Sequence, residues 1–299
     1  MKISRRAIKR VMGVICVLFL LTPLAAFAQN RVVVIPLFDG ACASGTCKPL
    51  KNIVTVAKAN GMFTDPVAAL NSITDASETN PYLAVIGPGV YTVTAPVVMK
   101  EWVDITGSGE NVTKIKGAIS GGTPNVSAVI KGANNSALSF LTVENTGGGS
   151  MLFNYSVALY DDNVSPTVTN VNAIAYGGTY NYGVYNGFSS ATMINVTATA
   201  SGGTSAHGVR NNDSSPVMTN VTATASGGTA SYGVYNDASV PVIRRSTMEG
   251  VTGGLYTKLG TAWVSQSTVR NGVAVGTAGT NKCVACDNGA GVALNENCL

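Results

Sequence analysis

The side chains in the second half of the chain that could together form a hydrolase site are Asp213, Asp237, His207 and Arg210. Enzymes that hydrolyse glycosidic bonds use two carboxyl groups, about 5–5.5 Å apart for retention or about 6.5–9.5 Å apart for inversion. The two aspartates stand in neighbouring sequence repeats with a one-residue offset, which permits such a distance, and His207 is the single histidine. These four residues form a candidate hydrolase cluster. The alternative is that they are ordinary turn residues in solvent, because the repeat carries Asn, Asp or Gly at the same positions.

A second set of residues is suited to binding rather than to catalysis. Tyr160, Tyr185, Arg210 and Tyr235 occupy equivalent positions in successive repeats, next to an apolar position such as Val184. Since neighbouring residues of a strand point to opposite faces, we expect this column to face outward. Tyrosines two repeats apart would be about 9.6 Å apart, a spacing compatible with stacking on a polysaccharide. The alternative is that the tyrosines only shield a strand edge or fill a groove.

An internal repeat sets these positions. Tyr182-Gly-Val-Tyr-Asn186 recurs as His207-Gly-Val-Arg-Asn211 and as Tyr232-Gly-Val-Tyr-Asn236, at a step of 25 residues. A fixed period of 20–50 residues is typical of stacked units that share one core. Each unit contains three short alternating strands between turn residues and has no helical period. The sequence therefore predicts an all-β fold, a right-handed parallel β-helix, with equivalent strands about 4.8 Å apart.

Alignment of the repeats also predicts which residues form the interior. Two apolar columns result, one of Leu159, Val184, Val209 and Val234, the other of Val168, Met193, Met218 and Ile243. Asparagines recur at a bend between two strands, where stacked amides can hydrogen-bond from coil to coil: Asn170, Asn195 and Asn220. Arg245 replaces the asparagine in the next coil.

The chain divides into five expected parts. Residues 1–28 are an export signal, 29–52 an N-terminal segment, 53–80 a strand and a capping helix, 81–282 the β-helix, with the 25-residue repeats at about 157–250, and 283–299 a cysteine-containing tail. Asp65 and Pro66 begin the helix as N-cap and first-turn residue. A helix at this position covers the core and the strand edge that the first coil would otherwise expose.

Residues 1–28 have the composition of a secretory signal peptide. Basic residues are followed by the apolar run Val11–Leu21 and by Ala26-Phe27-Ala28 before Gln29. All five charged residues of the segment are basic, so the 19 basic and 15 acidic residues of the whole chain become 14 and 15 after cleavage, a net charge of −1. We therefore expect a secreted or cell-surface protein, with the periplasm as a further location, which meets a membrane only during export and has no nucleic-acid partner.

Cysteine content agrees with an oxidising compartment. The exported part keeps five cysteines, Cys42, Cys47, Cys283, Cys286 and Cys298. We expect a disulfide between the first two and another between two of the last three. Because five is an odd number, one thiol stays free or pairs with a partner chain. A zinc site at Cys283 and Cys286 is disfavoured because only Cys298 is near as a third ligand. No metal or other cofactor is expected.

Several segments of the exported part form the series first strand, capping helix, Gly-Pro-Gly-Val-Tyr turn and following coils: Ile53–Ala57, Phe63–Leu70, Val85–Tyr91, Ile105–Gly109, Thr113–Gly117, Leu141–Thr146 and Val157–Leu159. This series resembles the pectinesterases and their β-helix relatives of the pectin lyase-like superfamily. The resemblance implies a right-handed parallel β-helix and is specific for fold rather than for activity.

Departures from the family pattern concern its catalytic residues. Where the family has a glutamine before valine-alanine-leucine, this chain has Tyr155 and Ser156, and the arginine that follows is replaced by Tyr160. The two segments that carry the family's catalytic aspartates are missing. We therefore expect a non-catalytic surface or matrix protein that binds carbohydrate through the tyrosine column. The alternative is a polysaccharide-active enzyme, pectinesterase-like or glycoside hydrolase-like, with a relocated active site.

Overall fold

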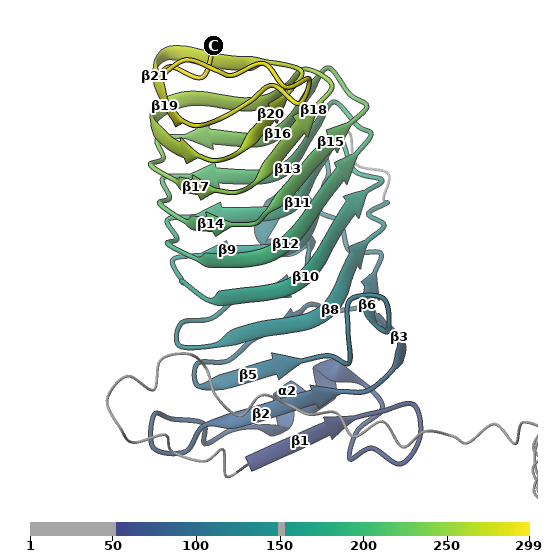
Figure 1. Ribbon diagram of the computed structural model, residues 1–299. Coiled ribbons are helices and arrows are strands. Elements are labelled where there is room, and N and C mark those ends of the chain that lie inside the picture. The colour runs from purple at the N-terminus through teal and green to yellow at the C-terminus, as the bar shows by residue number, and fades with distance from the viewer. Residues whose placement is uncertain (1–51, 149–152) are drawn as a thin grey trace, which may run out of the picture. The chain divides into compact units, whose positions relative to one another are not determined.

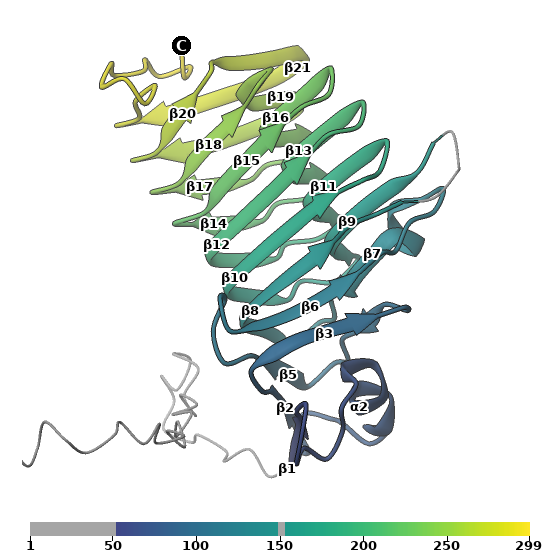
Figure 2. The ribbon, with the colours of Figure 1, turned by 90° about the vertical axis from the view of Figure 1, so that its right-hand side faces the viewer.

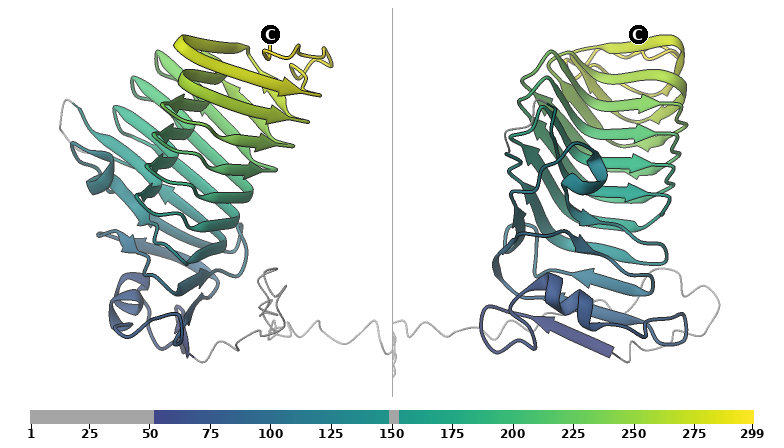
Figure 3. Two further views of the ribbon diagram at one scale, coloured as in Figure 1. Left: turned by 90° about the vertical axis from the view of Figure 1, so that its left-hand side faces the viewer. Right: turned by 180° about the vertical axis from the view of Figure 1, so that it is seen from behind.

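The computed structural model describes residues 52–148 and 153–299, which belong to one compact unit, Thr46–Leu299. The expected signal peptide, residues 1–28, and the expected Cys42–Cys47 disulfide lie outside the described residues. The described part is a right-handed parallel β-helix, and the predicted fold class is confirmed. Figures 1 and 3 show its strands lying one above another from the N-terminal to the C-terminal coil.

The first coil is covered by a short helix, as predicted. Strand β1 (Asn52–Val56) pairs in parallel with β2 (Tyr82–Ile86), and helix α2 (Pro66–Ser72) lies between them in the chain. The Asp65 carboxylate accepts a hydrogen bond from the Val67 amide at 3.0 Å, which caps the helix, and Pro66 occupies its first turn. Buried Ala69 and Leu70 attach α2 to the core. Figure 2 shows α2 beside β1 and β2 at the N-terminal end of the stack.

Each coil contributes strands to three faces. We call them sheets 1, 2 and 3. Sheet 1 contains β4 (Val97–Val98), β7 (Ala128–Lys131), β9 (Tyr155–Asp162), β11 (Tyr180–Gly187), β13 (Ser205–Asn212) and β16 (Ala230–Asp237), and continues into the first parts of β19 (Gly253–Ser265) and β21 (Val273–Val284). Every pairing along it is parallel, so each coil gives its backbone hydrogen bonds to the coils above and below.

Sheets 2 and 3 share several long strands that bend at their middle. Sheet 2 contains β1, β2, β5 (Val103–Thr106), the first halves of β8 (Ala137–Asn145), β10 (Thr167–Tyr176) and β12 (Thr192–Ser201), then β14 (Val217–Thr219), β17 (Val242–Arg244) and the last parts of β19 and β21. Sheet 3 contains β3 (Gly89–Val93), β6 (Thr113–Gly117), the second halves of β8, β10 and β12, then β15 (Thr222–Ser226), β18 (Thr247–Gly250) and β20 (Thr268–Arg270). A 3-10 helix, η1 (Pro124–Ser127), precedes β7.

The interior is built from the columns that the repeat predicts. Leu159, Val184, Val209 and Val234 are in register in successive coils and are fully buried. The same holds for Val168, Met193, Met218 and Ile243. One continuous apolar core therefore runs through the coils, and each coil depends on its neighbours for burial.

The bend between sheets 2 and 3 explains the recurring asparagines. Asn170, Asn195 and Asn220 have φ angles of 52°, 55° and 53°, in the left-handed region that asparagine tolerates better than most residues. The amide of Asn195 donates to Asn170 at 3.0 Å and that of Asn220 donates to Asn195 at 2.7 Å, so the predicted amide ladder is present. Arg245 keeps the same bend with φ 47°.

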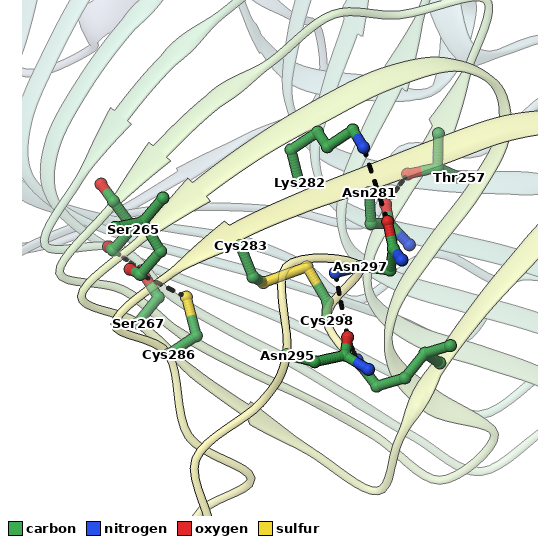
Figure 4. The surroundings of a disulfide bond; sticks show 12 residues. Thr257, Ser265, Ser267, Asn281, Lys282, Cys283, Cys286, Asn295, Asn297 and Cys298 are labelled. Atoms are coloured by element: carbon green, nitrogen blue, oxygen red, sulfur yellow. Dashed lines mark hydrogen bonds between the residues drawn. A yellow bond between two sulfur atoms is a disulfide. The ribbon is translucent and has the colours of Figure 1, made fainter.

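The last coil is closed by the cysteine-containing tail. Cys283, at the end of β21, forms a disulfide with Cys298, 15 residues further on. Cys286 remains a thiol, is buried, and lies to one side of the bridge near Ser265 and Ser267 (Figure 4). The disulfide therefore fastens the C-terminal segment over the open end of the core.

Candidate functional site

The candidate site lies on the outer side of sheet 1. In β11, Asn181 and Val184 are fully buried, whereas Tyr180, Tyr182 and Tyr185 lie on the outside. Two residues separate Tyr182 from Tyr185, so the alternation of the strand slips by one position at Gly183. A Cβ at Gly183 would lie 2.7 Å from the Gly208 carbonyl oxygen, which explains why glycine is required at this slip.

The slip brings aromatic side chains from both arms of each strand together. The rings of Tyr182 and Tyr185 are 5.6 Å apart within one coil. Between coils, Tyr155 stacks on Tyr180 at 4.8 Å, and Tyr232 stacks on Tyr256 at 4.9 Å. We call the complete set the aromatic face: Tyr155, Tyr160, Tyr180, Tyr182, Tyr185, His207, Arg210, Tyr232, Tyr235 and Tyr256.

The predicted tyrosine column is one part of this face. Tyr160, Tyr185, Arg210 and Tyr235 are in register from coil to coil and lie on the outside. Tyr185, Arg210 and Tyr235 are partly exposed, but Tyr160 is buried, with 9% of its surface accessible. Tyr160 and Tyr185, in adjacent coils, have ring centres 5.3 Å apart. They pack against a second set of rings that the sequence interpretation did not include.

One coil interrupts the aromatic face with polar groups. At the three outward positions of β13, Ser205, His207 and Arg210 replace the tyrosines found in β11. The Ser205 hydroxyl lies 3.2 Å from His207 Nε2 and 3.4 Å from the Ala230 carbonyl oxygen. His207 is 1% exposed and stacks between Tyr182, at 5.2 Å, and Tyr235, at 4.5 Å.

Arg210 is held by tyrosines rather than by a carboxylate. Its guanidinium carbon lies 4.6 Å from the ring centre of Tyr235, 5.6 Å from Tyr182 and 5.9 Å from Tyr185. None of the ion pairs among the described residues includes Arg210. A partly buried cation that has tyrosine rings and the Tyr185 hydroxyl, but no carboxylate, as partners among the described residues is a natural binding partner for an anion.

Burial and the neighbouring cation keep His207 neutral. Loss of solvent lowers the pKa of His207 well below its usual value, and the Arg210 charge lowers this pKa further. His207 Nδ1 is buried without a hydrogen-bond partner in the described part of the chain. Within the face, burial raises the pKa of Tyr182. Burial together with the Asp162 carboxylate raises the pKa of Tyr160.

The two candidate catalytic carboxylates do not join this group. Asp213 is exposed at a turn, with φ 50°, and its carboxylate accepts from the Asn212 amide at 3.0 Å. Asp237 lies at the end of β16 and forms an ion pair with Lys258 at 2.9 Å. The structure therefore brings His207 and Arg210 together and leaves the aspartates with other partners. In the same turn column stand Asn163, Phe188 and Ala238, all with positive φ, which identifies the Asp213 position as a turn position.

Two further properties concern the described residues as a whole. No cluster of three or more His, Cys, Asp or Glu side chains with metal-binding geometry occurs in residues 52–148 and 153–299. Within the same ranges, the helices are too short and too polar to cross a membrane.

Known structures resemble this stack of coils in its fold. Carrot pectin methylesterase superposes with a TM-score of 0.59 at 16% identity, over 82% of this chain and 85% of that one. PemA of Erwinia chrysanthemi gives 0.56 at 14%, over 84% and 92%, and the Yersinia enterocolitica enzyme gives 0.56 at 14%, over 79% and 93%. The chain has the pectin methylesterase fold. No protein-family model matches the sequence, and no curated protein matches it. At these identities the likeness describes the fold alone.

Proposed function

We propose that this protein is exported and binds an acidic polysaccharide through the aromatic face without cleaving it. The observation that carries the proposal is Arg210, a cation enclosed by three tyrosine rings and without a carboxylate partner among the described residues. The fold shared with carrot pectin methylesterase, an enzyme named for its action on pectin, supports a role connected with carbohydrate.

Stacked tyrosines provide the apolar part of the binding site. A sugar ring has one or two apolar faces that pack against aromatic rings, and the tyrosine hydroxyls offer hydrogen bonds at the edge. Rings at distances of about 5 Å continue over the coils from Tyr155 to Tyr256. A surface that repeats with the coil spacing suits a ligand that itself repeats, such as a polymer chain.

Arg210 provides the selective part of the site. A guanidinium binds a carboxylate through two parallel hydrogen bonds, and such charge-assisted bonds are worth about 1.5–3 kcal/mol each. Neutral His207 is buried beside Arg210 and adds no charge of its own, and the tyrosine hydroxyls can form hydrogen bonds with sugar hydroxyl groups. A uronic acid residue, with a carboxylate beside hydroxyl groups, matches this combination.

The runner-up is a polysaccharide-active enzyme whose active site has moved, and one observation favours it. Ser205 and His207 are within hydrogen-bond distance, as a serine nucleophile and its base are in acyl-transfer enzymes. However, a base must accept a proton, and burial together with Arg210 disfavours the imidazolium. Both carboxylates that might serve glycosidic cleavage lie at strand ends with other partners. The positions where the pectinesterase resemblance places a glutamine and an arginine hold Tyr155, Ser156 and Tyr160.

Export is part of the proposal. The disulfide between Cys283 and Cys298 is the kind of bond that persists in oxidising compartments, and the N-terminal sequence is that of a signal peptide. We place the protein in the cell exterior, on its surface or in the periplasm. A disulfide to a partner chain would have to use Cys42 or Cys47, because Cys286 is buried.

The experiment is a glycan-array assay combined with turnover assays on pectic, acetylated and other acidic polymers. We expect the wild-type protein to bind acidic glycans, and Tyr185→Ala and Arg210→Gln to lose this binding. Trp263→Ala is the matched control, since Trp263 is an exposed aromatic residue of sheet 2 that is 53% accessible. Polymer turnover that disappears in Ser205→Ala or Asp213→Asn would overturn the non-catalytic proposal.

A further inference from the structure

A chain of buried polar side chains runs through the interior directly behind the aromatic face. The amide of Asn186 donates to Asn211 at 2.8 Å, and Asn211 donates to Asn236 at 2.8 Å. The chain continues from Asn236 to Thr257 at 3.1 Å and from Thr257 to Asn281 at 2.7 Å. All five side chains are at most 2% exposed. We call this series the inner ladder. In this orientation Asn186, Asn211, Asn236 and Thr257 each donate toward the C-terminal coil, and Asn281 accepts the last hydrogen bond.

Both ends of the inner ladder lack a partner. At its N-terminal end, Asp161 is in register with Asn186, and it is fully buried. Neither carboxylate oxygen of Asp161, nor Asn186 Oδ1, has a hydrogen-bond partner among the described residues. At the C-terminal end, Asn281 Nδ2 is also without one. Two buried acceptor groups in neighbouring coils without a hydrogen between them are costly, so the pair requires a proton on one of them.

Within residues 52–148 and 153–299, the surroundings of Asp161 offer no charge that could replace a proton. Below it lies Gly132, where a Cβ would come within 2.0 Å of Asp161 Oδ1, and Pro166 lies beside it. Its neighbours in β9, Tyr160 and Asp162, interact with each other on the outer side. Lys131, from the coil below, bonds to Asn125 instead. Burial alone therefore acts on Asp161 and raises its pKa to about 8.

We infer that Asp161 is a protonated carboxylic acid in the folded protein at neutral pH and donates its hydroxyl hydrogen to Asn186 Oδ1. The inner ladder then has an unbroken direction from Asp161 to Asn281. Loss of the proton leaves a carboxylate that needs a donor. The ladder supplies this donor if each asparagine amide rotates by 180° and the Thr257 hydroxyl turns to the opposite side. Asn186 Nδ2 then donates to Asp161, and Asn281 Nδ2 donates to Thr257.

Proton loss therefore reverses a ladder that spans five coils. Each ladder residue in β11, β13 and β16 directly follows a member of the aromatic face, since Asn186 follows Tyr185, Asn211 follows Arg210 and Asn236 follows Tyr235. On the interior side of the strands that present the aromatic face, the direction of the hydrogen bonds thus depends on the protonation of Asp161. The inference is independent of whether the face binds carbohydrate.

The test compares wild type with Asp161→Asn in urea unfolding of the full exported chain between about pH 6 and pH 8. An asparagine at 161 keeps the size and donates to Asn186 without a proton. Since the folded pKa is about 8 and the unfolded value about 3.9, wild type loses stability through this range as the folded state gives up its proton. Relative to Asp161→Asn, we expect the wild-type unfolding constant to increase about 50-fold. Taking the difference between the two proteins cancels the contribution of His207.

Asp162→Asn is the control, because Asp162 is only partly buried and interacts with Tyr160; we expect the pH profile of wild type. Infrared spectroscopy of folded wild type at pH 6 should show the carbonyl band of a protonated carboxylic acid, absent in Asp161→Asn. If Asp161→Asn were less stable than wild type at pH 8, this result would contradict the inference. So would wild-type stability at pH 8 that increases with added potassium or calcium ions, since a cation would then occupy the place of the proton.

Discussion

Replacement of Arg210 by methionine separates stability from binding. The guanidinium lies over three tyrosine rings, and each cation–π contact contributes about 0.5–2 kcal/mol. Against this stands the desolvation of a mostly buried charge, which costs several kcal/mol when no carboxylate compensates it. A methionine of similar length packs well against the same rings. We therefore expect the free energy of unfolding of Arg210→Met to equal that of wild type or to exceed it by about 1–2 kcal/mol.

The same substitution should weaken the binding of an anion. Losing one or two charge-assisted hydrogen bonds to a carboxylate, at about 1.5–3 kcal/mol each, lowers the affinity for an acidic oligosaccharide by at least about 10-fold. Urea unfolding and isothermal titration on the same samples measure both quantities. Arg244→Met, at an exposed arginine of sheet 2, serves as the control and should change neither. A loss of more than about 3 kcal/mol of stability with unchanged affinity would refute the reasoning, because Arg210 would then be a structural clamp.

Three further predictions concern the coils themselves. Met218→Ala, at a fully buried position, should lower the free energy of unfolding measured in urea by about 2–5 kcal/mol. Thr219→Ala, at the next residue, is the control and should change this free energy by no more than about 0.5 kcal/mol. Equal effects of the two substitutions would mean that the Met218 column does not lie in the interior. Asn211→Ala breaks the inner ladder and should lower the free energy of unfolding by about 2–4 kcal/mol. Asn195→Gly, in the exposed ladder of Asn170, Asn195 and Asn220, should lower it by less than about 1 kcal/mol. The opposite order of the two effects would contradict the assigned burial. Cys298→Ser opens a loop of 15 residues and should lower stability by about 3 kcal/mol, with reductant destabilising wild type but not the variant.

The 25-residue repeat was the main basis for predicting the fold. A strict 25-residue step determines which residues stack, so the columns of Val184 and Met218 and the amide ladder of Asn195 could be assigned from the sequence. Capping by Asp65 and Pro66 is a local signal and was equally readable. The choice between Cys283, Cys286 and Cys298 was not, because it depends on how the tail crosses the last coil.

The site was harder to predict because of one backbone detail. Strict alternation assigns Tyr182 and Val184 to the same face, so the sequence interpretation placed only the Tyr185 column outside. The slip at Gly183 reverses that assignment and places Tyr182, His207 and Tyr232 on the outer side of sheet 1, where Tyr182 and His207 are covered by neighbouring rings. Glycine at the same position of three successive repeats was the available signal, since an invariant glycine inside a strand marks a bend or a close approach. Asp213 has the positive φ of a turn residue, which agrees with the turn interpretation given beside the catalytic one.

A structure of the protein with a bound acidic oligosaccharide tests the central claim most directly. The account predicts sugar rings stacked on Tyr185 and Tyr235 of the aromatic face, with a carboxylate in hydrogen-bond contact with the Arg210 guanidinium and the oligosaccharide intact. An oligosaccharide bound on sheet 2 or sheet 3, or bound on sheet 1 with Arg210 turned away from it, would contradict the account.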